Sequence, residues 1–272
     1  MRSYSLLRQL IRGTLLQEGV YDPGVLKAVF MAGGPGSGKS FTAKILFGAD
    51  PTSVSESMTA SGLKIINSDP AFEKFLRDVG VDPSDLAKIA QEDPELAYQL
   101  GLVDERGVPV ESPRGKAKEI KKKLMSTFTR PEARLGVILD GTGDDFDKIV
   151  DKKEDLEEMG YDTYMVFVNT TLDIAQERNA NRSRKMDPNK VEEIWSDVQS
   201  NLGTFQQLFG ANNIVIVDNT VYGPIPENIA KAVDTFLRRP IRNPIGREWI
   251  EAELSTRGGG TAKERRRLMG QR

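Results

Sequence analysis

Residues 33–40 restrict the fold of this chain more than any other segment does. They read Gly-Gly-Pro-Gly-Ser-Gly-Lys-Ser and match the phosphate-binding pattern G-x-x-x-x-G-K-[ST] at every fixed position. Glycines let the backbone curl so that its N–H groups point at phosphate oxygens, and the positive end of the following helix adds to the attraction. A nearly unbroken apolar run at 25–32 precedes the loop, and helix-forming residues 39–47 follow it. This order predicts a strand, a phosphate-binding loop and a helix, and it disfavours a chance glycine-rich turn.

The loop also supplies most of the predicted nucleotide contacts. Lys39 is expected to reach the β- and γ-phosphates of ATP, and the Ser40 hydroxyl is expected to bind Mg²⁺. ATP and Mg²⁺ are therefore the expected cofactors. The predicted nucleotide-binding residues are Gly33, Gly34, Pro35, Gly36, Ser37, Gly38, Lys39, Ser40, Phe41 and Arg178.

Short apolar runs alternate with longer helical segments along the chain. This alternation predicts an α/β fold, a three-layer sandwich with about five parallel strands and helices on both faces of the sheet. The expected strands are 25–32, 64–67, 135–140, 163–168 and 213–217, and the main expected helices after the third strand are 144–159, 171–184, 188–209 and 225–238.

The remaining segments suggest how the chain is divided. A helix at 3–17 is expected to pack on the core, and the tail is expected to be basic and partly flexible with a helix in 245–254. The predicted divisions are an N-terminal helical segment 1–24, a main domain 25–239 that holds a helical acceptor-side insertion at 71–130 and an arginine-rich lid at 178–190, and the tail 240–272.

Composition narrows the chemistry that this chain can perform. The 272 residues include no cysteine and no histidine, which excludes disulfides, thiol nucleophiles, Ser-His triads and histidine-ligated metals. A catalytic base would then be a carboxylate, and Lys, Arg or a hard metal ion would stabilise developing charge. The net charge of −2 means that contact with nucleic acid would depend on a local patch. No apolar run approaches the ~20 residues of a membrane span, so we expect no membrane contact and a cytoplasmic location.

Two aspartates follow predicted strands. Asp69 comes directly after the second strand, where a carboxylate can accept the proton of an attacking hydroxyl group. The alternative is an N-cap residue that opens the helix at 71–76, and the two roles are compatible. Asp140 ends the third strand, as a Walker-B carboxylate that holds Mg²⁺ does. Its alternative is a capping residue in a strand-to-helix turn.

A basic cluster lies between the fourth and fifth strands. Arg178, Arg182 and Arg184 stand close together in the predicted lid. Arginines there can clamp a transferring phosphoryl group, and Arg182 and Arg184 are the better catalytic candidates because they lie nearer the tip. The alternative is a solvated helix face that pairs with nearby acids. Residues 218–220 follow the fifth strand and give a weak signal for a loop beside the adenine base.

Together these motifs resemble the zeta-toxin and polynucleotide-kinase branch of P-loop kinases, in the layout of phage-encoded members. The resemblance covers about 27–217 and rests on Ala32–Ser40, Asn67–Asp69, Asp140–Thr142 and the arginine-rich lid. It implies a sheet with the P-loop strand at its centre, Asp69 as base, Lys39 and the lid arginines as charge stabilisers, and Mg²⁺ near Ser40 and Asp140. A phage-encoded member would work in the host cytoplasm. Phe72-Glu73 stands where polynucleotide kinases place a substrate-orienting arginine.

The acceptor of the phosphate is the most open part of the prediction. Residues Arg114–Lys123 contain six basic residues and one acid, and could contact the phosphates of DNA or a nucleotide if Ile120 and Leu124 dock the helix. The alternative is an ordinary solvated lysine face. Three functions follow: a kinase of a nucleic acid or nucleotide, a kinase of a nucleotide sugar, or an ATPase or ATP-binding module. Gly141 counts against the last, which needs a glutamate beside Asp140.

Overall fold

The computed structural model describes residues 19–48, 59, 61–103, 107–182, 184–257 and 262–270. The helix predicted at 3–17 lies outside these residues. At the centre are five parallel strands in the order β2-β3-β1-β4-β5. The P-loop strand β1 is therefore the middle strand, as the resemblance implies. The strands are β1 Lys27–Ala32, β2 Lys64–Ile66, β3 Val137–Asp140, β4 Asp162–Asn169 and β5 Ile214–Asp218.

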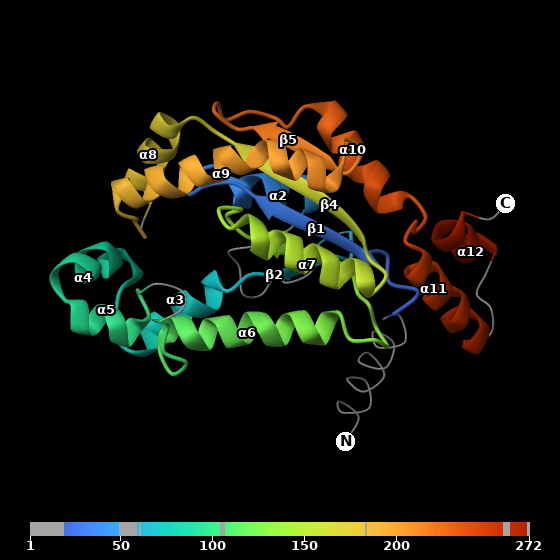
Figure 1. Ribbon diagram of the computed structural model, residues 1–272, viewed down its shortest axis with the longest axis horizontal. Helices are drawn as coiled ribbons and strands as arrows, with labels where there is room; N and C mark the ends of the chain where they lie inside the picture. Colours follow the sequence, from blue (N-terminus) through green and yellow to red (C-terminus); the bar gives the residue numbers. More distant parts are fainter. Residues whose placement is uncertain are drawn as a thin grey trace, which may run out of the picture.

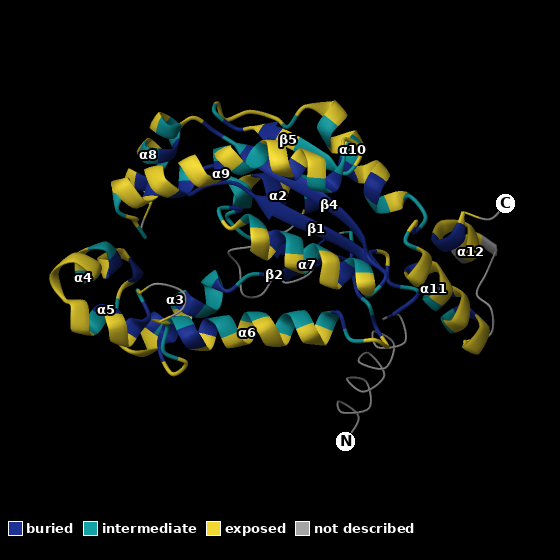
Figure 2. Ribbon diagram, in the orientation of Figure 1, coloured by how far each residue is buried: buried dark blue, intermediate teal, exposed yellow. Residues whose placement is uncertain are grey.

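Helices cover both faces of this sheet (Figure 1). Alternate residues of β1 point to opposite faces. Phe30 packs on the side of α7 (Phe146–Glu158) and α9 (Pro188–Phe209), and Val29 packs on the side of α2 (Lys39–Phe47) and α10 (Glu227–Arg238). All six residues of β1 are buried, and Figure 2 shows the central strands in the buried colour. The predicted three-layer α/β fold is confirmed.

The helices are α2 Lys39–Phe47, α3 Asp69–Asp78, the 3₁₀ turn η1 Pro83–Asp85, α4 Leu86–Glu92, α5 Pro94–Leu100, α6 Pro113–Phe128, α7 Phe146–Glu158, α8 Leu172–Ala180, α9 Pro188–Phe209, α10 Glu227–Arg238, α11 Pro244–Thr256 and α12 Ala262–Met269.

Helices α3 to α6 form a lobe with a small core of its own. Phe72, Leu76 and Ala117 belong to this core, which is separate from the two cores of the sheet. Of the two residues predicted to dock α6, Ile120 is 39% exposed, so its part of the prediction is wrong, whereas Leu124 is half-buried. Buried Ala117 docks the helix instead, and half-buried Met125 packs against the main core. Ser112 caps α6 by accepting a hydrogen bond from the Gly115 N–H at 3.0 Å.

The segment after α10 is tied to the start of the sheet. The Asp162 carboxylate pairs with the ammonium of Lys27 at 3.0 Å, and both side chains are almost fully buried. The same carboxylate accepts hydrogen bonds from the backbone N–H groups of Arg242 and Asn243. Asn243 then caps α11, which contains the helix predicted at 245–254.

The end of the tail is more ordered than the sequence suggests. Residues 262–269 form α12, whose Leu268 and Met269 side chains are buried in the main core. The basic cluster lies on this helix, and Arg267 donates a hydrogen bond to the carbonyl of Tyr21 at 3.0 Å. Among the described residues, no helix is long and apolar enough to cross a membrane.

Candidate active site

The P-loop curls between the end of β1 and the start of α2. Gly36 and Gly38 have φ angles of 75° and 88°, which side-chain-bearing residues rarely adopt. A Cβ atom on Gly36 would lie 2.5 Å from the carbonyl oxygen of Ala175, so α8 leaves no room for one. The loop is fastened on the other side too, because the Asn219 amide donates to the carbonyl of Ser37 at 2.7 Å. The loop conformation is thus fixed by its neighbours as well as by its own sequence.

Lys39 lies at the floor of this loop. Its ammonium donates to the carbonyl of Gly33 at 2.5 Å and approaches that of Gly34 at 3.4 Å. Burial lowers the pKa of Lys39, and the nearby Asp140 carboxylate opposes this shift. The ammonium therefore lies inside the curl that the sequence predicts for ATP phosphates.

Asp140 is held so that one of its oxygens is available. The Asn67 amide donates to its Oδ2 atom at 3.0 Å, while its Oδ1 atom is buried and accepts no hydrogen bond from any residue that the structure describes. Burial raises the pKa of this carboxyl group, and the ammonium of Lys39 opposes the shift.

A buried, unsatisfied carboxylate oxygen fits a hard cation. Mg²⁺ is commonly held by one or two protein oxygens together with phosphates and water, so Asp140 and the Ser40 hydroxyl at the start of α2 suit it. No group of three or more acidic side chains that could hold a metal occurs in the described part of the chain. The residues present therefore fit a magnesium ion that is shared with ATP and do not fit an all-protein metal cage.

Asp69 lies between two arginines from different elements. Ser68 is the N-cap residue of α3, and Asp69 is its first helical residue. Its carboxylate accepts hydrogen bonds from Arg114 of α6 at 3.3 Å and from Arg184 of the lid at 3.2 Å. Burial acts to raise the pKa of Asp69, but the two guanidinium groups outweigh it and hold the pKa below its usual value. The carboxylate is therefore ionised over the whole physiological range.

Asn67 links the two aspartates. Its side-chain carbonyl accepts the Asp69 backbone N–H at 2.9 Å, while its amide donates to Asp140. The candidate base and the candidate metal ligand are thus positioned by one side chain, which the sequence analysis quoted within Asn67–Asp69 but did not predict as a site residue. Its place directly after β2, on the same sheet edge as Asp140, was the available signal.

The predicted arginine cluster divides into two parts. Arg178 donates to the carbonyls of Gly36 and Thr220 at 3.3 Å and stacks over the Tyr222 ring with 4.2 Å to the centroid. Arg182 is exposed, and its charge acts on both Lys39 and Asp140. Helix α8 ends at residue 180 rather than at the predicted 184, and Arg184 beyond this end contacts the Asp69 carboxylate.

Aromatic side chains flank the P-loop. The rings of Phe41 and Tyr222 meet edge to face at 5.4 Å, and 62% of Tyr222 is exposed. Tyr222 was missed, although it follows the strand end at 218–220 where the sequence gives a weak adenine signal. Trp195 packs against Gly34 and donates from its indole N–H to the carbonyl of Thr170 at 2.9 Å. These rings form apolar surface beside the loop.

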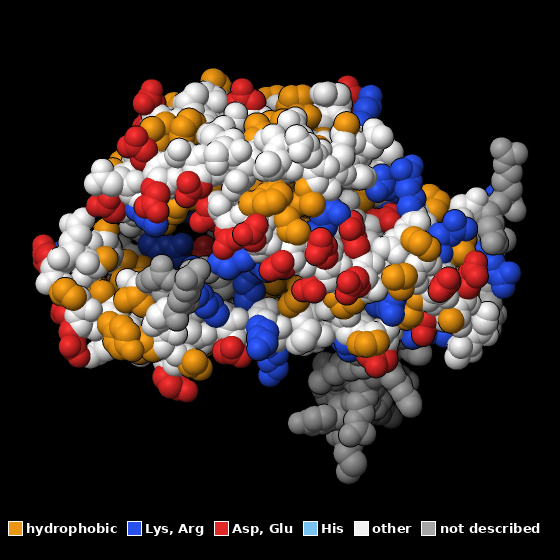
Figure 3. All heavy atoms as spheres, in the orientation of Figure 1, with side chains coloured by type: hydrophobic (Ala, Val, Ile, Leu, Met, Phe, Trp, Pro, Cys, Tyr) orange, Lys and Arg blue, Asp and Glu red, His pale blue; other side chains and the backbone are white. Residues whose placement is uncertain are grey.

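The basic residues of α6 fall into two groups, one that contacts the site and one that is exposed to solvent. Arg114 faces Asp69, and the ammonium of Lys121 donates to the carbonyl of Asp140 at 3.0 Å. Lys116, Lys122 and Lys123 are exposed. Lys and Arg side chains also gather in a hollow between α6 and the helices above it in Figure 3. Part of the segment is thus turned inward, and part is the solvated face of the alternative interpretation.

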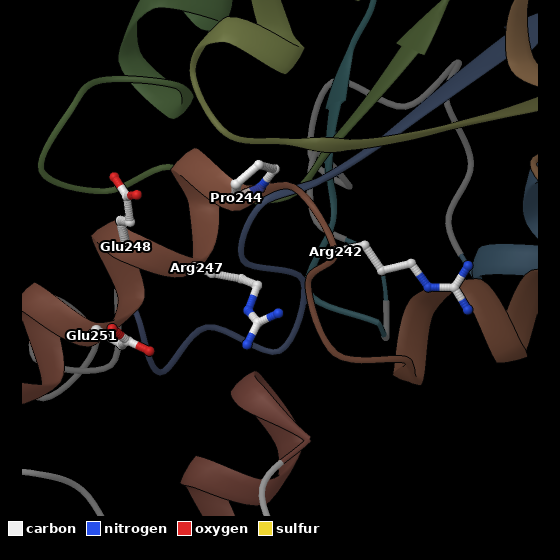
Figure 4. Close-up of a pocket in the computed structure, with 5 residues that line it drawn as sticks. All are labelled: Arg242, Pro244, Arg247, Glu248 and Glu251. Carbon is white, nitrogen blue, oxygen red and sulfur yellow. The ribbon is translucent and has the colours of Figure 1, made fainter.

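A second hollow lies at the other end of the sheet, on α11 (Figure 4). Arg247 is accompanied there by Glu248 and Glu251, with Arg242 and Pro244 completing the lining. Charges of both signs line this hollow, and it lies far along the chain from the residues of the P-loop. All the predicted catalytic residues belong to the first site.

No family model matches this chain, and no curated protein matches it. Several solved structures resemble it at low identity. A putative kinase from Chloroflexus aurantiacus has a TM-score of 0.45 at 13% identity, over 78% of this chain and 98% of that one. Shikimate kinase from Acinetobacter baumannii in complex with shikimate gives 0.40 at 11%, over 79% and 94%. The PezAT toxin-antitoxin structure from Streptococcus pneumoniae gives 0.48 at 14%, over 94% and 93%.

Structural similarity at these TM-scores and sequence identities does not indicate the activity or the substrate of this chain. The fold is instead assigned from the molecule itself: five parallel strands in the order β2-β3-β1-β4-β5, a P-loop after the central strand, and helices on both faces. The described residues therefore form a three-layer α/β fold with a P-loop after its central strand.

Proposed function

We propose that this protein is an ATP-dependent phosphotransferase that moves the γ-phosphate of ATP to a hydroxyl group of a nucleic acid or nucleotide. The observation that carries the proposal is the position of Asp69. It is an ionised carboxylate at the start of α3, in the α3–α6 lobe, and its charge acts on the P-loop lysine Lys39. Such a carboxylate has a use in phosphoryl transfer to a hydroxyl group, because it can accept the proton that the hydroxyl loses.

The proposal gives the remaining residues the following roles. The P-loop N–H groups and Lys39 would hold the phosphates, and Phe41 and Arg178 would lie beside the nucleotide. Ser40 and Asp140 would hold Mg²⁺, which neutralises charge on the phosphates when it is bound. A bond would form between the acceptor oxygen and the γ-phosphorus as the bond to the β-phosphate oxygen breaks. Asp69 would take the hydroxyl proton, while Arg182 and Arg184 would stabilise the charge on the transferred group.

The choice of acceptor is supported by the inward part of α6. Arg114 and Lys121 add positive charge on the acceptor side of Asp69, which favours an anionic acceptor. An ATPase is disfavoured because Gly141 occupies the position where a water-activating glutamate would stand.

The direct test is incubation with γ-labelled ATP and Mg²⁺ in the presence of DNA, RNA, nucleosides, nucleotides or nucleotide sugars. Label on a nucleic acid or nucleotide supports the full proposal, and label on a nucleotide sugar alone would replace the acceptor. Release of labelled phosphate without any labelled acceptor would show an ATPase and refute the transfer.

Lys39→Met tests the P-loop in this reaction. The variant removes the charge that the phosphates need but keeps the length of the side chain, so we expect at least a ~100-fold loss of transfer, a typical cost of removing one charge-stabilising donor. Circular dichroism and thermal melting should show an intact fold. The exposed Lys44→Met variant in the same helix is the matched control and should keep normal activity. Full transfer by Lys39→Met would remove the loop from the mechanism.

A further inference from the structure

Helix α3 presents the candidate base and an aromatic ring on one face. Asp69 and Phe72 are three residues apart, so their side chains lie about one helical turn from each other. Only 3% of Phe72 is exposed, and it belongs to the core of the α3–α6 lobe with Leu76 and Ala117. The carboxylate therefore lies beside a ring whose position is fixed by the packing of the lobe.

The same two guanidinium groups contact the carboxylate and the ring. Arg114 of α6 donates to Oδ1 of Asp69 at 3.3 Å, and Arg184 of the lid donates to Oδ2 at 3.2 Å. The guanidinium carbon of Arg114 lies 5.0 Å from the centroid of the Phe72 ring, and that of Arg184 lies 6.0 Å from it. Glu73 lies 3.9 Å from Arg184, beyond hydrogen-bond distance. Asp69 and Phe72 together thus hold two arginines that come from different elements.

The carboxylate alone is a weak anchor for these arginines. Each arginine makes one long hydrogen bond to it, and 43% of the Asp69 side chain is exposed. Ion pairs at such positions contribute little, because water screens them and because ordering an arginine side chain costs conformational entropy. The two guanidinium groups also repel each other. A second attraction offsets these costs, and an aromatic ring provides one for cations.

Arg184 also joins the lid to the lobe. The lid is held on its own side by the buried Asn179 amide, which donates to the Met186 carbonyl at 2.7 Å and accepts the Met186 N–H at 3.0 Å. On the other side, Arg184 reaches α3, and Asp187 accepts a hydrogen bond from Gln91 of α4 at 3.0 Å. In Figure 1 the turn between α8 and α9 faces this lobe. The contact with Gln91 is exposed, so Arg184 makes the more buried of these two links.

We infer that Phe72 is a positioning residue, whose ring holds Arg114 and Arg184 on the Asp69 carboxylate and thereby docks the lid on the acceptor lobe. Its part in the reaction rests on the proposed function, in which Asp69 is the base and Arg184 stabilises charge. The docking of the lid does not depend on that function and can be measured without a substrate. Phe72 contacts no reacting group in this proposal and acts only through the two arginines.

Limited proteolysis with trypsin measures the docking directly. Trypsin cleaves after an arginine only when that side chain enters the pocket of the protease, so an Arg184 that is held on α3 protects the bond that follows it. We expect the full-length Phe72→Leu protein, without nucleotide, to be cleaved after Arg184 at least ~5-fold faster than the wild type, as loss of one cation–π contact allows. Mass spectrometry identifies each cut, and cleavage within the basic cluster of α12 is the internal reference.

Phe75→Leu is the matched control. Phe75 lies on the same helix and packs against the same lobe core, but the cation over its ring is Lys74, at 5.7 Å, which is not a residue of the site. Loss of this ring should weaken the lobe core and leave cleavage after Arg184 unchanged. Equal acceleration in Phe72→Leu and Phe75→Leu would overturn the inference, because it would reduce Phe72 to an ordinary core residue.

Fluorinated phenylalanines at position 72 separate the attraction for cations from packing. Fluorine withdraws electrons from the ring and weakens its attraction for a cation, while the shape of the ring stays nearly the same. Mono-, di- and trifluorophenylalanine should therefore give a stepwise increase in cleavage after Arg184, with unchanged circular dichroism. A cleavage rate that stays constant across the series would overturn the inference, and this result can be read even if Phe72→Leu does not fold.

The transfer assay separates this inference from the proposed function. If both hold, the fluorinated proteins should lose kcat by about fivefold over the series and keep their KM for ATP, because Arg184 loses its position while the P-loop is intact. Loosening of the lid in a protein that transfers no phosphate would support the docking and refute the proposed function. A lid that the series does not change, in a protein that transfers phosphate, would refute the docking and support the function.

Discussion

Asp69 has a carboxylate whose charge is set by two distant residues. Arg114 lies 45 residues away and Arg184 lies 115 residues away along the chain, yet both donate to it. Arg114 also brings its guanidinium over the Phe72 ring, at 5.0 Å to the ring centroid. Helix α6 therefore supplies positive charge to the start of α3 from another element.

This pairing predicts how the reaction depends on pH. Asp69 accepts a proton only when ionised, so the rate should be constant above the pKa of Asp69 and fall as pH drops through it. Because the two arginines lower this pKa, the fall in rate at acid pH (the acid limb of the pH–rate profile) should occur below the usual pKa of an aspartate side chain. Arg114→Met removes one guanidinium, which raises the pKa and should move the limb to higher pH. The measurement is kcat/KM against pH.

The acid limb itself can be assigned with Asp69→Asn. That variant should lose about 10²- to 10⁴-fold in turnover, the usual contribution of a general base, and should keep its affinity for ATP. An unchanged rate in Asp69→Asn would leave Asp69 as a helix-start residue only. A limb that does not move in Arg114→Met would mean that another group controls it.

At the scale of elements, the P-loop depends on α8 as much as on its own glycines. Gly36→Ala would place a methyl group 2.5 Å from the carbonyl of Ala175, in a backbone region that alanine avoids. We expect at least a ~10-fold loss in ATP affinity by calorimetry, equivalent to about 1.4 kcal/mol. Gly203→Ala in α9 has open space around it and should leave ATP binding unchanged and stabilise the helix by up to about 1 kcal/mol. Equal ATP affinity in both variants would contradict this account of the loop.

The elements also show which features the sequence could predict. The P-loop and the strand–helix alternation depend on neighbouring residues, so the five strands and most helices were found within a few residues of their places. Ile120 was misassigned because a lysine-rich helix gives a weak amphipathic pattern, and its docking is decided by the small residue Ala117. The pairing of Arg114 with Asp69, and the inward turn of Lys121, depend on how the α3–α6 lobe meets the sheet. No local pattern records that contact.

At the scale of the whole molecule, the pair of Lys27 and Asp162 joins the start of the sheet to the segment before α11. Their side chains are only 3% and 4% exposed. Asp162→Asn would leave a buried ammonium without its counter-charge, and such changes cost about 3–5 kcal/mol. Lys27→Met should cost less, because Asp162 keeps its backbone donors and Arg239 nearby. Urea unfolding of both variants measures the difference, and equal losses would show that the backbone donors and Arg239 do not compensate Asp162 for the lost ammonium.

The same lysine makes stability depend on pH in a defined window. Burial lowers the pKa of Lys27 from 10.5 to about 8, against the attraction of Asp162. The unfolded chain therefore binds more protons than the folded chain between these two pH values, and this residue makes stability rise with pH across them. Lys27→Met should flatten that part of the curve. An unchanged slope in repeated urea titrations from pH 8 to 10 would assign it to other groups.

Trp195, which packs against Gly34 of the P-loop, gives the protein an optical reporter at its phosphate site. The chain has two tryptophans. The other, Trp249, belongs to α11, at the end of the sheet where β1 begins, and the guanidinium of Arg134 lies over its ring. The fluorescence of Trp195 should therefore change when a nucleotide binds to the P-loop, and that of Trp249 should change when α11 separates from the sheet. A Trp249→Phe protein reports nucleotide binding without an added label. A Trp195→Phe protein reports the detachment of α11.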